Sequence, residues 1–327
     1  MIKFKTFLYE AVKPAPAAGS GSNTKMGDAY EMGTVLHIHN NTAAKGNTNK
    51  EYQAKIKDLK QKHEEALSHF SPEKQADIKK KSEDSAKAYL GSLAKEEGIK
   101  PEHIHEVHHT NLGISDHIGH DVVRADNPHD LVIKGKKGRS KFMHGASLKA
   151  TAGTASNNPI ASFERQSAAH GMDVGTTKAW AAGKKKVGLT GLTNAQIKER
   201  RHEPEVVAAN SETQQKAAKQ HAKAFNGATH NQQKEHILHF LKAHPDMPYH
   251  YVVGEKGGKS VPIDKHPAVA ALNKAKKITA TVKNNNVHFH DEHGNHIATA
   301  EHRPTHGSFY SPQTNFKFGS VKAPSND

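Results

Sequence analysis

The sequence predicts an α/β fold in which helices and strands occupy different stretches of the chain. Residues 51–67 and 72–96 are charged and amphipathic, and a further helix is expected over residues 27–39. From residue 104 onward the pattern changes to short alternating or apolar runs separated by Gly-rich turns, which is typical of strands. Hydrophobic residues make up 34% of the chain, so we expect a modest core with polar connecting segments.

Several short strands are expected, and two of them form a hairpin. Residues 130–134 are an apolar run, the segment Gly135–Gly138 supplies a turn, and residues 141–149 resume as a strand. A helical pattern rich in Lys, Gln and Ala covers residues 183–235. The other expected strands are residues 104–110, 249–253, 278–282, 287–290 and 297–301, with a turn at 292–295.

Positive charge strongly exceeds negative charge. Lys and Arg number 47 against 33 Asp and Glu, which gives a net charge of +14 at pH 7. Such an excess favours a polyanionic partner such as DNA, because each phosphate contact releases condensed counterions; the alternative is that the charge only keeps the chain in solution. Cysteine is absent, which excludes disulfides, thiolate metal sites and a cysteine nucleophile. No run of about 18 apolar residues exists, so we expect no membrane-spanning helix.

The most specific pattern begins at Asn127-Pro128-His129-Asp130 and continues, after the hairpin turn, at Ser147-Leu148-Lys149. Side chains two apart on a strand share one face, so Ser147 and Lys149 point the same way. An Asp at the start of the neighbouring strand reaches the same place. The pattern therefore predicts that Asp130, Ser147 and Lys149 lie together in one cleft.

This arrangement resembles the metal-binding core of the PD-(D/E)XK nuclease superfamily. In that superfamily an Asp begins the second core strand, and an acidic residue and a Lys lie two apart on the third. The resemblance covers about residues 25–170 and rests on motifs alone. It implies a restriction-endonuclease-like mixed central sheet flanked by helices, with a helical insertion at 51–96 and a C-terminal β extension.

The resemblance also suggests how the chain divides. The expected parts are a leader and flexible linker (1–24), a nuclease-like core with its helical insertion (25–180), a basic helical segment (181–245) and a C-terminal β-rich extension (246–327).

Phosphodiester hydrolysis explains why these residue types are needed. A divalent cation offsets charge on the phosphate and acidifies a water, and hard oxygen ligands suit magnesium, with manganese as a substitute. The resemblance implies that Asp130 is the main metal ligand and Lys149 the water-orienting group. Lys149 would deprotonate the water if its pKa is lowered, or stabilise developing charge if it is not.

Two further positions complete the candidate catalytic set. Superfamily members often add an acid from the first helix, and Glu31 is the candidate here, also as a metal ligand; the alternative is a surface Glu favoured by the helix dipole. Position 147 is Ser where Asp or Glu is usual. Either the site binds metal through other groups, or it has lost catalysis.

Three polar segments are candidates for contact with phosphate. The basic hairpin turn lies beside the proposed site, and Lys184–Lys186 is a second basic run; the alternative for the turn is simple solvation. The polar segment Thr151–Pro159 either lets backbone amides approach a phosphate or is an ordinary loop. The candidate nucleic-acid-binding residues of the turn are Lys134, Lys136, Lys137, Arg139 and Lys141.

Histidine is unusually frequent, with 27 residues. Imidazole is a common ligand of transition metals, so a zinc-binding structural protein is one alternative. No zinc-finger or HExxH spacing is present, and exposed polar histidine is the default expectation. The clusters are His103, His105, His108 and His109; His117 and His120; and His288, His290, His293 and His296.

Residues 1–11 are expected to form a separate N-terminal segment with its own role. Their apolar residues fall near one face of a short helix, and a linker rich in Pro, Ala, Gly and Ser follows. The segment Leu8-Tyr9-Glu10-Ala11 resembles the cleavage site of capsid-targeting leaders in large tailed bacteriophages. The resemblance implies docking to a phage capsid or scaffold, and a location in the phage head or the host cytoplasm; the alternative is a frayed N-terminal helix.

The function expected from these patterns is magnesium-dependent DNA cleavage by a phage-encoded, head-packaged endonuclease. The alternative is a non-enzymatic, DNA-binding internal head protein with a degenerate nuclease fold. The two differ in geometry. An enzyme requires Asp130, Lys149 and an additional acid to converge in one cleft, whereas a binding protein requires only a positive surface.

Overall fold

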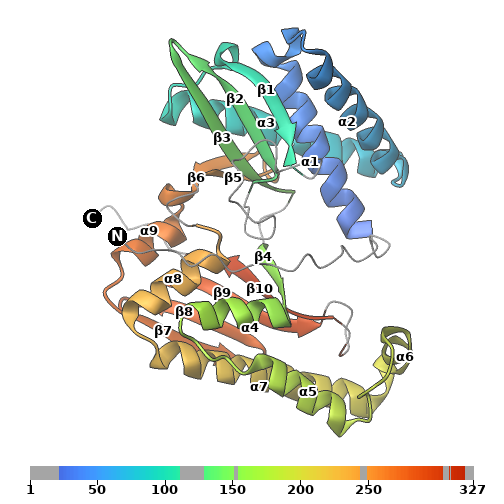
Figure 1. Cartoon of the computed structure of the whole chain (residues 1–327), viewed down its shortest axis with the longest axis vertical. Coiled ribbons are helices and arrows are strands. Elements are labelled where there is room, and N and C mark those ends of the chain that lie inside the picture. The colour runs from blue at the N-terminus through green and yellow to red at the C-terminus, as the bar shows by residue number, and fades with distance from the viewer. Residues whose placement is uncertain are drawn as a thin grey trace.

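The computed structural model describes residues 22–110, 129–150, 154–243, 249–304, 309 and 311–320. Over these residues the chain is a mixed α/β protein with nine α-helices and two five-stranded sheets, so the predicted α/β class is confirmed. Figure 1 shows the first sheet and three N-terminal helices in the upper half, and the second sheet in the lower half. None of the helices described here combines the length and apolar character that crossing a bilayer requires.

The three N-terminal helices form where the sequence pattern predicts them. They are α1 (Ser22–Asn40), α2 (Lys50–Ser68) and α3 (Pro72–Glu96). Asn49 and Ser71 cap α2 and α3 by accepting hydrogen bonds from backbone N–H groups of the first turn. Helix α3 opens with proline, whose fixed φ suits that position. All three predicted helices are confirmed, and α1 begins earlier than expected.

The first sheet is mixed, because one pair of its strands is parallel. Neighbouring strands are antiparallel except β3 and β5, whose parallel register places Ser147 opposite Tyr251. Four of the five strands were predicted from sequence, and the last was not. The strand order is β1 (Ile104–His109), β2 (Leu131–Lys137), β3 (Ser140–Lys149), β5 (Tyr249–Val253) and β6 (Lys259–Pro262).

The hairpin between β2 and β3 turns later than predicted. Gly135 lies inside β2 opposite Phe142, and the turn includes Gly138, where φ is +61°. Glycine at 135 instead permits a close approach, since a Cβ there would lie 2.0 Å from the carbonyl oxygen of His103. The basic residues of this segment are therefore spread along two strands rather than gathered in one turn.

Helices α1 and α3 cover one face of the first sheet. Tyr30 on α1 and Tyr89 on α3 are fully buried there, and burying a large apolar side chain contributes about 1.5–3 kcal/mol. Because side chains alternate along a strand, the other face of β1–β3 carries a different set. Members of this open face are Glu106, Lys134, Lys136, Lys141 and Met143.

The second sheet is antiparallel throughout. The C-terminal strands that the alternating pattern predicted are confirmed, and each extends slightly beyond its predicted bounds. The strand order is β4 (Thr154–Pro159), β10 (Pro312–Phe318), β9 (His296–Pro304), β8 (Asn286–Asp291) and β7 (Ile278–Lys283).

Strand β4 corrects both expectations for Thr151–Pro159, that its backbone amides approach a phosphate or that it is an ordinary polar loop. Residues 154–159 pair with β10, so these backbone groups take part in a sheet. The polar side chains, which disfavour strands in general, find partners of their own here. Ser156 Oγ donates to the carbonyl oxygen of Phe240 at 2.6 Å, and Asn158 donates to Ser156 Oγ at 2.9 Å. Residues 151–153 lie outside the described residues.

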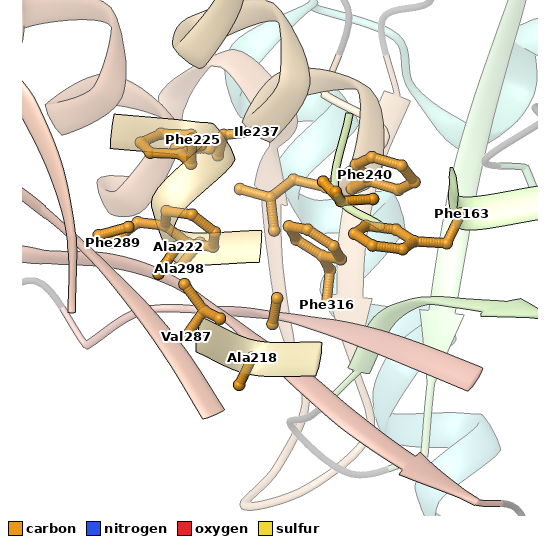
Figure 2. Close-up of a cluster of buried hydrophobic side chains, with 14 of the residues drawn as sticks. Phe163, Ala218, Ala222, Phe225, Ile237, Phe240, Val287, Phe289, Ala298 and Phe316 are labelled. Carbon is orange, nitrogen blue, oxygen red and sulfur yellow. The ribbon is translucent and has the colours of Figure 1, made fainter. Parts of the chain in front are cut away.

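Helices cover the inner face of the second sheet around a core of aromatic rings. Figure 2 shows Phe163, Phe225, Phe240, Phe289 and Phe316 converging from helices and strands. The rings of Phe240 and Phe316 stack with centroids 4.7 Å apart. The helices that contact the sheet are α4 (Ile160–Ala169), α7 (Pro204–Gly227), α8 (His230–Phe240) and α9 (Pro267–Lys274). Helix α5 (Thr176–Lys186) packs on α4 and α7, and α6 (Asn194–Glu199) follows it in the chain.

The chain passes between the two sheets more than once. After β3 it leaves the first sheet to build β4 and helices α4–α8, returns for β5 and β6, and leaves again for α9 and β7–β10. The expected C-terminal β-rich segment at 246–327 therefore supplies strands to both sheets. Tyr251 of β5 also joins the two cores, because its ring lies 4.9 Å from that of Phe318.

Three fully buried histidines form a hydrogen-bonded row inside the second core. Nδ1 of His221 lies 3.1 Å from Nε2 of His302, and Nε2 of His221 lies 3.0 Å from Nε2 of His236. The row ends at Thr314, whose Oγ1 lies 3.0 Å from Nδ1 of His302. Burial lowers the pKa of all three imidazoles, that of His302 to about 3. The folded chain therefore holds these rings neutral.

We expect acid to destabilise the fold through this row. The unfolded chain binds protons at these histidines near pH ~6.5, and the folded chain does not. Their stabilisation is complete above that pH and is lost as pH falls toward the lowered folded-state pKa values. Over this pH range each ring lowers the free energy of unfolding by up to about 1.4 kcal/mol per pH unit. Urea unfolding across this range measures the loss.

A matched control is His293→Gln, which changes a histidine whose side chain is 75% exposed. This variant should follow the wild-type pH profile. An unfolding free energy of the wild type that stays level from neutral pH down to about pH 5 would contradict a neutral buried row.

Candidate active site

Asp130 is held at one end of the first sheet, where β1 and β3 finish and β2 begins. Its backbone N–H donates to the carbonyl oxygen of Ala146 at 2.8 Å, and its carbonyl oxygen accepts from the N–H of Thr110 at 3.1 Å. Gly145 leaves room for the preceding residue, since a Cβ there would lie 1.9 Å from Cδ2 of His129. The Asp-containing turn is therefore fixed between two strands before its side chain makes any contact.

The carboxylate of Asp130 bonds to the edge of β3. Its Oδ2 accepts from the backbone N–H of Leu148 at 2.6 Å and from Ser147 Oγ at 3.2 Å, and lies 3.5 Å from Nζ of Lys149. The carboxylate thus takes the place that a β2 residue would fill if the strand began earlier. All three contacts fall on Oδ2, and among the described residues Oδ1 has no hydrogen-bond partner.

Glu31 reaches the same place from α1. Burial raises the pKa of Glu31, and the negative charge of Asp130 raises it further, while His109 and Lys149 act in the opposite direction. Its side chain is 18% exposed, against 25% for Asp130 and 24% for Lys149. The structure therefore joins Ser147 and Lys149 to Asp130 by direct contacts, and it places Glu31 near enough for its charge to act on Asp130 and Lys149.

Lys149 is protonated in this setting. Burial alone would lower the pKa of its ammonium group, but the charges of Asp130 and then Glu31 outweigh burial and raise this pKa above its ordinary value. A lysine whose pKa is raised does not take a proton from water at neutral pH. Of the two roles expected for Lys149, proton abstraction does not fit this raised pKa, whereas stabilising negative charge and orienting water does.

His109, Asp28 and Tyr251 also lie at this site, although none of them was predicted to belong to the nuclease-like set. The His109 side chain is 3% exposed, and its Nε2 lies 3.5 Å from Oε2 of Glu31. Asp28 lies one helical turn before Glu31, and its pKa, raised by burial, is lowered in part by His109. The spacing of the two acids on α1 was a usable signal. The positions of His109 and Tyr251 depend on strand pairing, which the sequence does not show.

The donor set suits a hard cation. Within the described part of the chain, no group of three or more His, Asp or Glu side chains is already arranged to hold a metal ion. Magnesium needs fewer, because it commonly keeps several waters and takes one or two carboxylates together with substrate phosphate oxygens. Asp130 and Glu31 supply such a pair.

A shallow groove of about 780 Å³ runs over the open face of β1–β3. Met143 is 48% exposed in it, and Lys134, Lys136 and Lys141 line it. By the alternation of β3, positions 141, 143, 145, 147 and 149 share this face, but the groove lies at the turn end of the hairpin and Ser147 and Lys149 lie at its other end. The ring of His129 covers Gly145 between them, so the expectation that the basic turn lies beside the site is wrong.

The other basic candidates lie elsewhere. Lys137 donates to the carbonyl oxygen of Glu97 at 2.9 Å and so fastens the hairpin to the end of α3, whereas Arg139 is exposed in the turn. Lys184–Lys186 form the last turn of α5, in the lower half of Figure 1. His117, His120 and the leader at 1–11 lie outside the described residues.

Comparison with known protein families, with curated proteins and with solved structures finds no match for this chain.

Replacing Asp130 by Ala should lower the free energy of unfolding by about 1–3 kcal/mol, because it leaves the buried N–H of Leu148 without an acceptor. Asp130→Asn keeps an acceptor and should cost less. Urea unfolding of both variants tests this expectation. Equal stability of Asp130→Ala and wild type would mean that the carboxylate does not support the edge of β3.

Proposed function

We propose that this chain is an endonuclease that hydrolyses phosphodiester bonds of DNA with magnesium or manganese. The observation that carries the proposal is the meeting of Glu31, Asp130 and Lys149 at one end of the first sheet. These residues come from a helix and two strands that are distant in the sequence. A protein that only binds DNA needs positive surface, and it gains nothing from two carboxylates facing a lysine.

A restriction-endonuclease-like arrangement is part of the proposal. It is supported by the mixed sheet, by α1 and α3 packed on one face, and by an Asp before β2 with a Lys at the end of β3. Helices α2 and α3 follow α1 in the chain at the place expected for an insertion, but α3 packs on the sheet and so belongs to its helical layer.

The electrostatics of the site favour a cation. Two partly buried carboxylates repel each other, and the pKa of Glu31 is raised in part for this reason. When bound, a divalent cation would polarise the phosphate and make a bound water more acidic. Asp130 Oδ1 and the Glu31 carboxylate would hold it, while Ser147 Oγ and the Leu148 N–H keep Asp130 in position.

Lys149 then acts on charge rather than on protons. Its ammonium group, protonated at neutral pH, would donate hydrogen bonds to the attacking water and to the phosphate oxygen on which negative charge develops. The basic groove near the turn of the β2–β3 hairpin would bind the DNA backbone farther along the same hairpin. The proposal includes packaging in a phage head, which is supported only by the resemblance of residues 1–11 to capsid-targeting leaders.

Purified protein should nick supercoiled plasmid when magnesium or manganese is added, and EDTA should stop the reaction. Lys149→Met and Glu31→Gln should each lower the cleavage rate by about 100-fold or more, the usual cost of removing one charge-stabilising group. A matched control is Lys57→Ala, which removes an exposed lysine from α2 and should cleave as wild type. Gel analysis of nicked and linear plasmid gives the rates.

The alternative is a DNA-binding internal head protein without catalysis, and one contact favours it. Ser147 stands where the superfamily has an acid, and its hydroxyl is spent on Asp130. In this case the plasmid assay gives retarded but intact DNA with either metal. Loss of cleavage in wild type and variants alike, with binding retained, would therefore overturn the enzymatic proposal and support the alternative.

The open face should set the salt dependence of DNA binding. Changing Lys136, Arg139 and Lys141 to Ala should reduce the slope of log K against log salt by about one for each phosphate contact removed. Fluorescence anisotropy with labelled duplex measures this slope, and Lys57→Ala is again the control. An unchanged slope in the triple variant would place the DNA on another surface.

A further inference from the structure

Three histidines gather on the outer face of the second sheet, far along the chain from the candidate active site. His288 and His290 alternate on β8, so both side chains lie on the face opposite buried Phe289. His296 begins β9, and its Cα pairs with that of His290 across the strands. The next position of β9 on this face is Thr299, which pairs with His288.

The three imidazole rings are mutual neighbours. Ring centroids lie 5.3 Å apart for His288 and His296, 5.4 Å for His290 and His296, and 6.3 Å for His288 and His290. Nδ1 of His288 lies 3.4 Å from Nε2 of His296, and Thr299 Oγ1 lies 3.2 Å and 2.8 Å from these two nitrogens. Two nitrogens bound to one tetrahedral ion at about 2.1 Å each would be separated by roughly 3.4 Å.

Hydrogen bonds to a buried carboxylate hold the turn of the hairpin that carries these rings. The Asp291 carboxylate is buried and accepts from the backbone N–H groups of His293 and Asn295 at 2.9 and 2.8 Å. These bonds fix the turn that leads from His290 to His296. By contrast, His293 in the turn is 75% exposed and lies beside Glu292, away from the other three rings.

Burial favours the neutral form of two of these rings, His288 and His296. Burial, and then the proximity of each ring's neighbours, lowers the pKa of His288 and of His296. Neutral imidazoles leave a lone pair for coordination at neutral pH. All three side chains are partly exposed, so an ion can reach them from solvent.

We propose that His288, His290 and His296 form a binding site for one divalent transition ion of the zinc class. Three imidazoles and a fourth position for water are a known donor set for zinc, and nitrogen donors disfavour magnesium. As they stand the three donors do not meet at one point. The pair His288 and His296 is already at the required separation, and the His290 ring turns about its side-chain bonds to complete the set.

This site differs in chemistry from the pair Asp130 and Glu31, which offers oxygen ligands. The two sites therefore predict different responses to zinc. Binding at the hairpin depends on imidazoles of β8 and β9, while binding at the end of the first sheet depends on carboxylates.

The test is calorimetric titration of metal-free protein with zinc. Wild type should bind one equivalent more tightly than any other. His288→Ala, His290→Ala and His296→Ala should each weaken that step by about 100-fold or more, since losing even a residue behind a metal ligand costs about 10–100-fold. His293→Ala, on the same hairpin, should bind as wild type. Far-UV circular dichroism checks that each variant is folded.

Two outcomes would overturn the proposal. One is an equal zinc affinity of wild type and the three hairpin variants, which would mean that the tight site lies among other histidines. The other is loss of the tight step in Glu31→Gln with the hairpin variants unaffected, which would place zinc at the carboxylates.

Discussion

The hydrogen bond from the backbone N–H of Leu148 to the Asp130 carboxylate is the contact on which the candidate site depends. At 2.6 Å it ties a side chain to the edge of β3 at the point where β2 has not yet begun. It fixes Asp130 beside Ser147 and Lys149 by backbone geometry. The protonation states of the site depend on these positions, because the two acids hold Lys149 protonated and Asp130 raises the pKa of Glu31. One bond to the main chain thus sets both the shape and the electrostatics of the site.

Local patterns in the sequence predicted most elements of the fold. Helices α2 and α3 follow from their charged, amphipathic patterns, and the alternation of β8 and β9 follows from period two. Strand β4 could not be found in this way. Its Ser and Asn residues have poor strand propensity, and they are stabilised by partners near the end of the chain that local pattern does not reveal.

The residues of the candidate site were likewise predicted only in part. Asp130, Ser147 and Lys149 could be placed together because a hairpin joins them, and hairpin register is a local property. His109 and Tyr251 could not, because each reaches the site through pairing with a strand that is distant along the chain. The amino-acid composition also did not show where the histidines would lie in the fold. The same residue type forms a neutral row in the apolar core and a partly exposed group on a hairpin.

The route of the chain between the sheets has a consequence for how the protein is made. Strand β3 finds its parallel partner only when β5 has been synthesised, after β4 and helices α4–α8. Until then one edge of β3 is unpaired, and such edges promote association between chains. Contacts of this long range also slow folding. A ribosome that stopped before Tyr249 would release a chain that contains Glu31, Asp130 and Lys149 but leaves their sheet open on one side.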